Sequence, residues 1–244
     1  MNELLDMKEL LKKIRSRGYW KIVIHPAMFV EKRVPNIADL YPILEKASVR
    51  FLGGEFPDLD TRTKLHIDTD WIGKAVSWEH YLELWRFYQS GQFIHWSGMR
   101  EDWRDRSSLW PSPQSGWKPG ADLVAHDAVF RLTEIFELAA RLARSQAGDQ
   151  QMHLEIVVSG LNGRALCDLP GRWPFHRKRS ASVSELPYKV DLSQLQLFTK
   201  AKELALEPAI ELFRRFGWDP PQDLLRDIQD EALGNRRAPA GSPK

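Results

Sequence analysis

Apolar and polar residues alternate along several stretches of the chain, as expected for β-strands that bury one face. In residues 19–25 every second side chain is a large apolar one, and Pro26 ends the segment because proline has no backbone N–H to donate. The other segments with an extended pattern are residues 49–52, 65–70, 71–78 and 152–158. The pattern therefore predicts a sheet of several short strands.

The most aromatic segment, residues 84–97, is predicted to fold back on itself at Ser90-Gly91 as a β-hairpin. A loop with an even number of residues would bring Trp85 opposite Trp96 and Arg86 opposite His95. One face would then carry Trp85, Phe87, Ile94 and Trp96, and the other Arg86, Tyr88, Phe93 and His95. Because aromatic side chains occupy both faces, we expect this hairpin in the interior of the sheet.

A second hairpin is predicted around Asn162-Gly163, a dipeptide that favours a tight turn in which the glycine has a positive φ. The strand 152–158 would return through residues 164–167, which places Cys167 across from Val158. Cys167 is the only cysteine, so it cannot form an intrachain disulfide. Its predicted role is that of a small buried apolar residue rather than a nucleophile.

The clearest helical pattern spans residues 127–147 and ends at Gly148. The apolar positions on one side are Val129, Leu132, Ile135, Phe136, Ala139, Leu142 and Ala143. The charged residues on the opposite side are Arg131, Glu134, Glu137, Arg141 and Arg144. This separation predicts an amphipathic helix that packs its apolar stripe against the core.

Shorter helical patterns occur toward both ends of the chain. An amphipathic helix is predicted before Gly18, and Asn36 is a suitable N-cap for another that continues to Ala47. Pro208 fits the first turn of a further helix, and the sequence after Gly217 fits the start of the last one. Residues 101–120 and 170–187 lack periodicity and are predicted to be loops.

No low-complexity linker divides the chain, so residues 1–234 are expected to form a single α+β domain and residues 235–244 a disordered tail. The antiparallel sheet of this domain would be built from the two hairpins, with helices at its periphery. The order of the predicted elements also allows two related halves, each with a small sheet.

Composition narrows the class of protein further. The 244 residues are 43% hydrophobic and 28% charged, and a net charge of +2 is too small for a strongly basic surface. The ten tryptophans fit either an aromatic core or an exposed stacking surface. No apolar run approaches the roughly 20 residues that a membrane span needs, and charges interrupt the N-terminal leucines. We therefore expect a cytoplasmic protein without a membrane partner.

Three segments resemble segments of uncharacterised bacterial proteins: residues 17–20 (RGYW), residues 85–93 (WRFYQSGQF) and residues 207–213 (EPAIELF). The resemblance is spread over most of the chain and implies a bacterial cytosolic context. It implies no activity and no catalytic or binding residue.

His66, Asp68 and Asp70 would share one face of an extended segment, because every second residue of a strand points the same way. Imidazole and carboxylate groups are suitable ligands for manganese, zinc or iron. A solvated strand face explains the same residues without a metal. The metal hypothesis would make the protein a metal-dependent hydrolase or nuclease.

Two other groups of residues are candidates for ligand binding. Arg86 and His95, if they are opposite each other, would form a polar pocket between aromatic walls. The residues Arg172, Trp173, Arg177, Lys178 and Arg179 combine cationic and aromatic side chains, which can neutralise phosphates and stack on bases. A solvated basic loop is the simpler explanation of this second group.

No phosphate-binding glycine loop and no Gly-x-Ser-x-Gly nucleophile motif occurs in the sequence. We therefore expect a non-enzymatic binding or interaction protein that needs no cofactor and has another protein as its partner. The alternatives are the metal-dependent enzyme and a protein that binds nucleic acid through residues 172–179.

Overall fold

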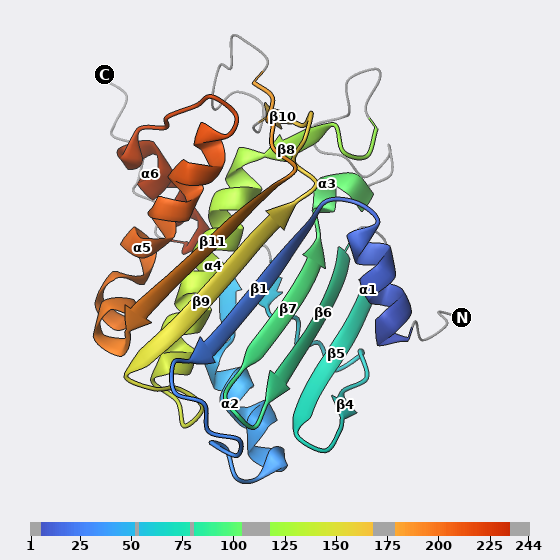
Figure 1. The fold of residues 1–244 in the computed structure, drawn as a ribbon, viewed down its shortest axis with the longest axis vertical. Coiled ribbons are helices and arrows are strands. Elements are labelled where there is room, and N and C mark those ends of the chain that lie inside the picture. Colours follow the sequence, from blue (N-terminus) through green and yellow to red (C-terminus); the bar gives the residue numbers. More distant parts are fainter. Residues whose placement is uncertain (1–5, 52–53, 79–80, 104–117, 168–178, 235–244) are drawn as a thin grey trace, which may run out of the picture.

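The computed structural model of the chain describes residues 6–51, 54–78, 81–103, 118–167 and 179–234. Its centre is a seven-stranded sheet in which neighbouring strands are antiparallel (Figure 1). In spatial order the strands are β11 (Glu185–Ser193), β9 (Gln151–Ser159), β1 (Tyr19–Pro26), β7 (Phe93–Gly98), β6 (Tyr81–Tyr88), β5 (Trp71–Trp78) and β4 (His66–Ile67). This architecture confirms the predicted α+β class.

Two short sheets and several helices surround the central sheet. β2 (Val49–Phe51) pairs with β3 (Gly54–Phe56) in an antiparallel hairpin, and β8 (Asp122–Val124) pairs with β10 (Ala165–Cys167) in parallel. The helices are α1 (Met7–Arg15), the 3-10 helix η1 (Ile37–Asp39), α2 (Leu40–Ala47), α3 (Arg100–Trp103), α4 (Ala125–Ala143), α5 (Gln194–Arg214) and α6 (Gln222–Ala232). No helix within the described ranges is long and apolar enough to cross a membrane.

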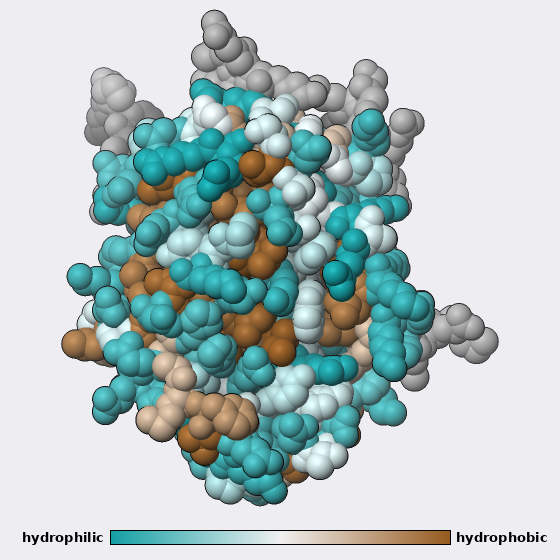
Figure 2. Space-filling view, viewed as in Figure 1, coloured by the Kyte–Doolittle hydropathy of each residue, from teal (hydrophilic) through white to brown (hydrophobic). Residues whose placement is uncertain are grey.

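The helices cover the two faces of the sheet unequally (Figure 1). α4 lies behind the sheet together with α2, α5 and α6, and the main hydrophobic core fills the space between these helices and the strands. We call this side the covered face. α1 packs on the other side, the open face, where its residues Met7, Leu10 and Ile14 meet Leu82 and Leu84 of β6. Figure 2 shows the open face, on which polar and apolar side chains are interspersed.

β1 shows how the sequence pattern sets these faces. Trp20, Ile22 and Ile24 are buried on the covered face, each with an exposed fraction of 5% or less. The alternate residue Lys21 is half-buried on the open face, where its ammonium group lies 3.1 Å from the Glu155 carboxylate of β9. The predicted alternation in residues 19–25 is therefore confirmed, and each buried apolar side chain contributes about 1.5–3 kcal/mol.

The aromatic hairpin is present as β6 and β7, but its predicted register was wrong by one residue. Phe87 pairs with Phe93 and Trp85 pairs with His95, so the connecting loop has an odd number of residues. These four side chains share the covered face, whereas Arg86 pairs with Ile94 on the open face. An odd loop length moves every side chain of one strand to the other face, which is why the predicted faces of β7 were inverted.

The second predicted hairpin was wrong in its pairing. β9 lies between β1 and β11, and Cys167 pairs with Val124 of β8 instead of facing Val158. The predicted turn is present, and Gly163 has the expected positive φ, at 77°. Gly160 also has a positive φ, of 79°, and so redirects the chain before the turn and separates the two segments. Because β6, β7 and β9 all belong to the one seven-stranded sheet, two related halves built on separate sheets are not seen.

The C-terminal half contains two further corrections. β11 includes the end of residues 170–187, which the sequence pattern had assigned to a loop. α5 begins at Gln194, where Ser193 and Gln196 form a capping box, so Pro208 lies inside the helix rather than in its first turn. The backbone of α5 departs from helical geometry at Lys200. Local signals such as Pro208 indicate helix but do not decide where the helix begins.

Candidate functional site

The covered face carries a polar patch in the middle of the apolar core. Glu83 of β6 and His95 and Ser97 of β7 have exposed fractions of 2% or less. Ser97 pairs with Glu83 on one side and with Trp20 on the other, so the patch lies in the centre of the sheet. Buried polar groups cost free energy unless they are well paired. The surroundings of this patch are therefore the first place to look for function.

The Glu83 carboxylate has three polar neighbours. Its Oε1 accepts a hydrogen bond of 2.7 Å from the Asp58 N–H, and its Oε2 accepts one from the Tyr81 hydroxyl. The Nε2 atom of His95 lies 3.3 Å from Oε2. Burial by itself raises the pKa of Glu83, but the His95, Arg131 and Tyr81 side chains together outweigh burial and lower the pKa below its ordinary value. Glu83 is therefore ionised at neutral pH.

His95 lies in an aromatic enclosure beside Glu83. Its ring centroid is 4.9 Å from that of Phe56, and Phe93 stacks on it from the same strand. Burial lowers the pKa of His95 and outweighs the opposite effect of Glu83, so the ring is neutral at neutral pH. Within the described part of the chain, Nδ1 of His95 has no hydrogen-bond partner.

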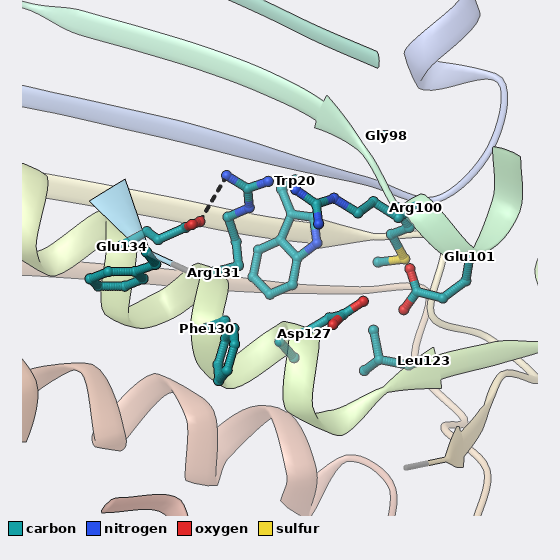
Figure 3. Close-up of a pocket in the computed structure, with 12 residues that line it drawn as sticks. Trp20, Gly98, Arg100, Glu101, Leu123, Asp127, Phe130, Arg131 and Glu134 are labelled. Carbon is teal, nitrogen blue, oxygen red and sulfur yellow. Dashed lines mark ion pairs between the residues drawn. The ribbon is translucent and has the colours of Figure 1, made fainter. Parts of the chain in front are cut away.

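α4 brings three charged side chains into a recess beside this patch: Asp127, Arg131 and Glu134 (Figure 3). Their spacing places them on one side of the helix. Arg131 forms an ion pair of 3.1 Å with Glu134, and the two side chains are only 12% and 14% exposed. The sequence pattern had placed both opposite the apolar stripe. At Arg131 and Glu134 that side is not solvated, because it faces the recess and the sheet, whereas Arg141 and Arg144 further along are exposed.

α3 adds Arg100 and Glu101 from the turn that follows β7. The Arg100 guanidinium lies 5.2 Å from the centre of the Tyr81 ring. Oε1 of Glu101 accepts a hydrogen bond of 2.8 Å from the Val124 N–H, directly before α4. Burial, reinforced by the Asp127 carboxylate, raises the pKa of Glu101 to about 7. A carboxyl group with this pKa gains and loses its proton near neutral pH.

Asp102, the next residue of α3, anchors this turn to the rest of the fold. Its carboxylate accepts hydrogen bonds of 2.9 Å from the Gly18 N–H and 2.7 Å from the Gly120 N–H. It also forms an ion pair with Arg164, in which both side chains are 1% exposed. A Cβ atom at Gly18 would lie 2.1 Å from this guanidinium, so only glycine fits there. The Asp102–Arg164 pair thus holds Glu101 in its position.

Two adjoining cavities lie between α4 and the sheet. The larger, of about 260 Å³, is lined by Gly54, Glu55, Asp58, Tyr81, Arg100, Arg131 and Glu134, and we call it the Tyr81 cavity. The smaller, of about 60 Å³, has Trp20, Glu101 and Asp127 among its lining residues, and we call it the Glu101 cavity (Figure 3). Arg100, Arg131 and Glu134 line both. We therefore treat the two cavities as one site, the cleft.

Among the described residues that line the cleft, carboxylates outnumber cations. The acidic residues are Glu55, Asp58, Glu101, Asp127 and Glu134, and the basic residues are Arg100 and Arg131. Glu134 is paired with Arg131, and Glu55 lies 3.1 Å from Arg50. Burial raises the pKa of Asp58 and of Glu134 as well as that of Glu101, so the cleft favours added positive charge. The arginines can in turn bind an anionic group.

His66, Asp68 and Asp70 are not brought together. His66 pairs with Gly73 of β5, whereas Asp68 and Asp70 are exposed in the turn between β4 and β5. Asp68 accepts a hydrogen bond of 2.8 Å from the Thr69 N–H. Among the residues described, no group of three or more His, Cys, Asp and Glu side chains is placed to hold a metal ion. The geometry gives no support to the metal hypothesis at this turn.

Arg86 and His95 do not form the predicted pocket, because they lie on opposite faces of the sheet. The Arg86 guanidinium stacks over Trp71 on the open face, 4.3 Å from the ring centre. His95, in contrast, lies beneath the cleft in contact with Phe56. Of the two residues, His95 is the one that belongs to the surroundings of the candidate site.

Most of the predicted basic aromatic group lies outside the described residues, namely Arg172, Trp173, Arg177 and Lys178. Arg179 is described, and its guanidinium donates a hydrogen bond to the Gly217 carbonyl. Nucleic-acid binding by this segment therefore stays a prediction.

The residues of the cleft were not recognised from the sequence. One local signal is Glu83, a charged residue between Leu82 and Leu84 in a strand. Arg131 follows an ordinary amphipathic pattern, and its role depends on where α4 lies in the fold.

No protein-family model, curated protein or solved structure matches the chain.

Proposed function

We propose that the protein binds a small polar molecule in the cleft between α4 and the sheet. The observation that carries this proposal is the convergence of charged side chains on two adjoining cavities of about 260 and 60 Å³. They come from β3 and the segment after it, from α3 and from α4, which are far apart in the sequence. Pockets with convergent polar groups and aromatic walls are typical of small-molecule sites.

The energetic cost of the cleft supports a functional role. Apolar side chains at the same positions would fill the core without the penalty of burying charges. Groups that served only the fold would also be expected to pair completely. In the part of the chain that the structure describes, Nδ1 of His95 and Oγ of Ser97 are buried without a hydrogen-bond partner.

The recessed position of the charges favours a small molecule over the protein partner that the sequence suggested. Arg131 and Glu134 are only 12% and 14% exposed, so a flat protein surface would not reach them. A small molecule that enters the Tyr81 cavity would contact both. We therefore keep the binding function that the sequence suggested, but with a small molecule instead of a protein as the ligand.

A thermal-shift screen of small polar metabolites tests this proposal. A ligand at a hundred times its Kd should stabilise the protein by about 2.7 kcal/mol, which raises the Tm by roughly 5–10 °C for a chain of this size. Arg131→Met should abolish the shift. Arg144→Met, at the exposed end of the same helix, should leave it unchanged.

A second pair of variants tests the same cleft should Arg131→Met fail to fold. Glu134→Gln changes the cleft with little change in shape, and Glu137→Gln is its control on the same helix, outside the cleft. A ligand that stabilises all four variants equally would show that it binds elsewhere. The absence of any stabilising compound would contradict the proposed function.

One observation favours a second candidate, acid–base catalysis on the bound molecule. Glu101 has a pKa raised to about 7 by burial and by Asp127, which shares the cavity. Neighbouring carboxyl groups in different protonation states can act as general acid and general base. This candidate predicts that Glu101→Gln loses conversion of the ligand even at a ligand concentration that saturates the variant, as followed by NMR of the reaction mixture. Binding without any conversion in the wild type would exclude it.

A further inference from the structure

We infer that the ligand of the cleft is a zwitterion of the amino-acid class, with its carboxylate on Arg100 and Arg131 and its ammonium group between Glu101 and Asp127. This inference rests on the proposed function, because it specifies what the same cleft binds. It follows from the separation of positive and negative side chains within the cleft, and from the sizes of the two cavities.

The two arginines form the anion-binding part of the cleft. Arg100 comes from α3 and Arg131 from α4, and both line both cavities (Figure 3). Arg131 has Glu134 as a partner at 3.1 Å, and the Arg100 guanidinium lies over the Tyr81 ring. A planar carboxylate accepts two parallel N–H bonds from a guanidinium, so the two arginines can together bind a ligand carboxylate.

Glu101 and Asp127 form the cation-binding part. Their carboxyl groups point toward one another in the Glu101 cavity (Figure 3). Among the described residues, the charged groups around Glu101 are Asp127 on α4, Arg164 before β10 and Arg100 on its own helix, and the Val124 N–H donates to one oxygen. In the free protein, burial and the Asp127 carboxylate both raise the pKa of Glu101 and so favour a proton on it. An ammonium group would replace that proton with a full positive charge and three N–H donors.

The cavity sizes favour a zwitterion over a simple anion or a simple cation. The Glu101 cavity, at about 60 Å³, has room for an ammonium group but not for a large substituent. The Tyr81 cavity, at about 260 Å³, leaves room for the rest of an amino acid. A simple anion would face the excess of carboxylates. A simple amine would leave the two guanidinium groups without a ligand contact.

Matched ligands test the inference on the wild-type protein. Each of the twenty standard L-amino acids is compared by calorimetry with the acid that lacks its amino group and with the amine that lacks its carboxylate. We expect at least one amino acid to bind at least tenfold more tightly than both counterparts. An acid or amine that binds as tightly as its amino acid would overturn the inference and leave the proposed function intact.

Two further outcomes are equally decisive. If no amino acid binds but another small polar molecule binds in the cleft, the inference is wrong and the proposed function stands. If neither amino acids nor any member of a broad metabolite library binds, both fall together.

Variants test which side chains bind the amino group of the ligand and which bind its carboxylate. Glu101→Gln should remove the preference for the amino group, so that an amino acid and its deaminated acid bind within about twofold of each other. Arg100→Met should remove the preference for the carboxylate in the same way. Asp127→Asn is the second variant should Glu101→Gln fail to fold, and Glu137→Gln is the control. A preference for the amino group that survives in both Glu101→Gln and Asp127→Asn would contradict the placement.

Discussion

The same side-chain type behaves in opposite ways at two buried positions of this protein. Glu83 lies beside His95, Arg131 and the Tyr81 hydroxyl, which together lower its pKa despite complete burial. Glu101 accepts one bond from the Val124 N–H and shares its cavity with Asp127, so burial dominates and its pKa is raised to about 7. The number of donors and the sign of neighbouring charges, rather than burial itself, decide the charge of each carboxyl group.

The raised pKa of Glu101 has a measurable effect on stability. The folded state binds a proton more tightly than the unfolded state, in which the carboxyl group has its ordinary pKa of 4.5. Its stabilising contribution is therefore fully present below that value and is lost as the pH rises through about 7. Between pH 4.5 and 8 the wild type should lose up to about 3 kcal/mol more than Glu101→Gln.

Urea denaturation at several pH values between 4.5 and 8 checks this prediction. The informative quantity is the difference between wild type and Glu101→Gln, because histidines titrate in the same range in both proteins. Glu137→Gln should follow the wild type. Parallel pH profiles for wild type and Glu101→Gln would show that Glu101 titrates normally.

At the scale of secondary-structure elements, the length of one loop decides which aromatic residues form the core. The loop between β6 and β7 leaves Phe87 opposite Phe93, and both side chains are fully buried. Ile94 points to the open face and is half-buried. The register also places His95 next to Glu83. The odd number of residues in this loop therefore determines that both side chains belong to the polar patch beneath the cleft.

Alanine substitutions distinguish this register from the one that the sequence suggested. Phe87→Ala and Phe93→Ala should each lower the free energy of unfolding by about 3–5 kcal/mol, because both lose burial and leave a cavity. Ile94→Ala should cost at most about half as much. Chemical denaturation measures all three. A larger loss for Ile94→Ala than for Phe93→Ala would favour the alternative register.

At the scale of the whole molecule, the Asp102–Arg164 pair joins segments that are distant in the sequence. It connects α3 to the turn between α1 and β1 through Gly18, and to the segment before β8 through Gly120. Both charged groups are buried, so each is stabilised by the other instead of by water. This connection fixes α3, whose Glu101 in turn accepts a hydrogen bond from the Val124 N–H directly before α4, beside the cleft.

A double-mutant cycle tests the role of this pair. Asp102→Asn and Arg164→Met should each cost about 3–5 kcal/mol, because each leaves an uncompensated buried charge. The double variant should cost clearly less than the sum of the two single changes. Urea denaturation provides the four free energies. Additive costs would mean that the two side chains stabilise the fold independently.

The sequence by itself determined those secondary-structure elements and turns that depend on residues close together in the chain. The alternation around Ile22 specified β1, the apolar stripe around Leu132 specified α4, and Asn162-Gly163 specified a turn with a positive φ. Periodicity and turn chemistry are local properties, so they can be read without knowing the fold. The α+β class followed from these elements together.

Only the tertiary structure decided which elements meet and what lies between them. β9 could pair with either flanking segment on its local pattern, and it lies between β1 and β11 because it buries its apolar face beneath α4 and α5 there. Asp58, Glu101 and Arg131 carry no shared sequence signal, since they come from the segment after β3, a single helical turn and a long helix. They become one site because strand register and helix packing are non-local. Both are set by the burial of the core as a whole, and this packing determines where the charged side chains lie.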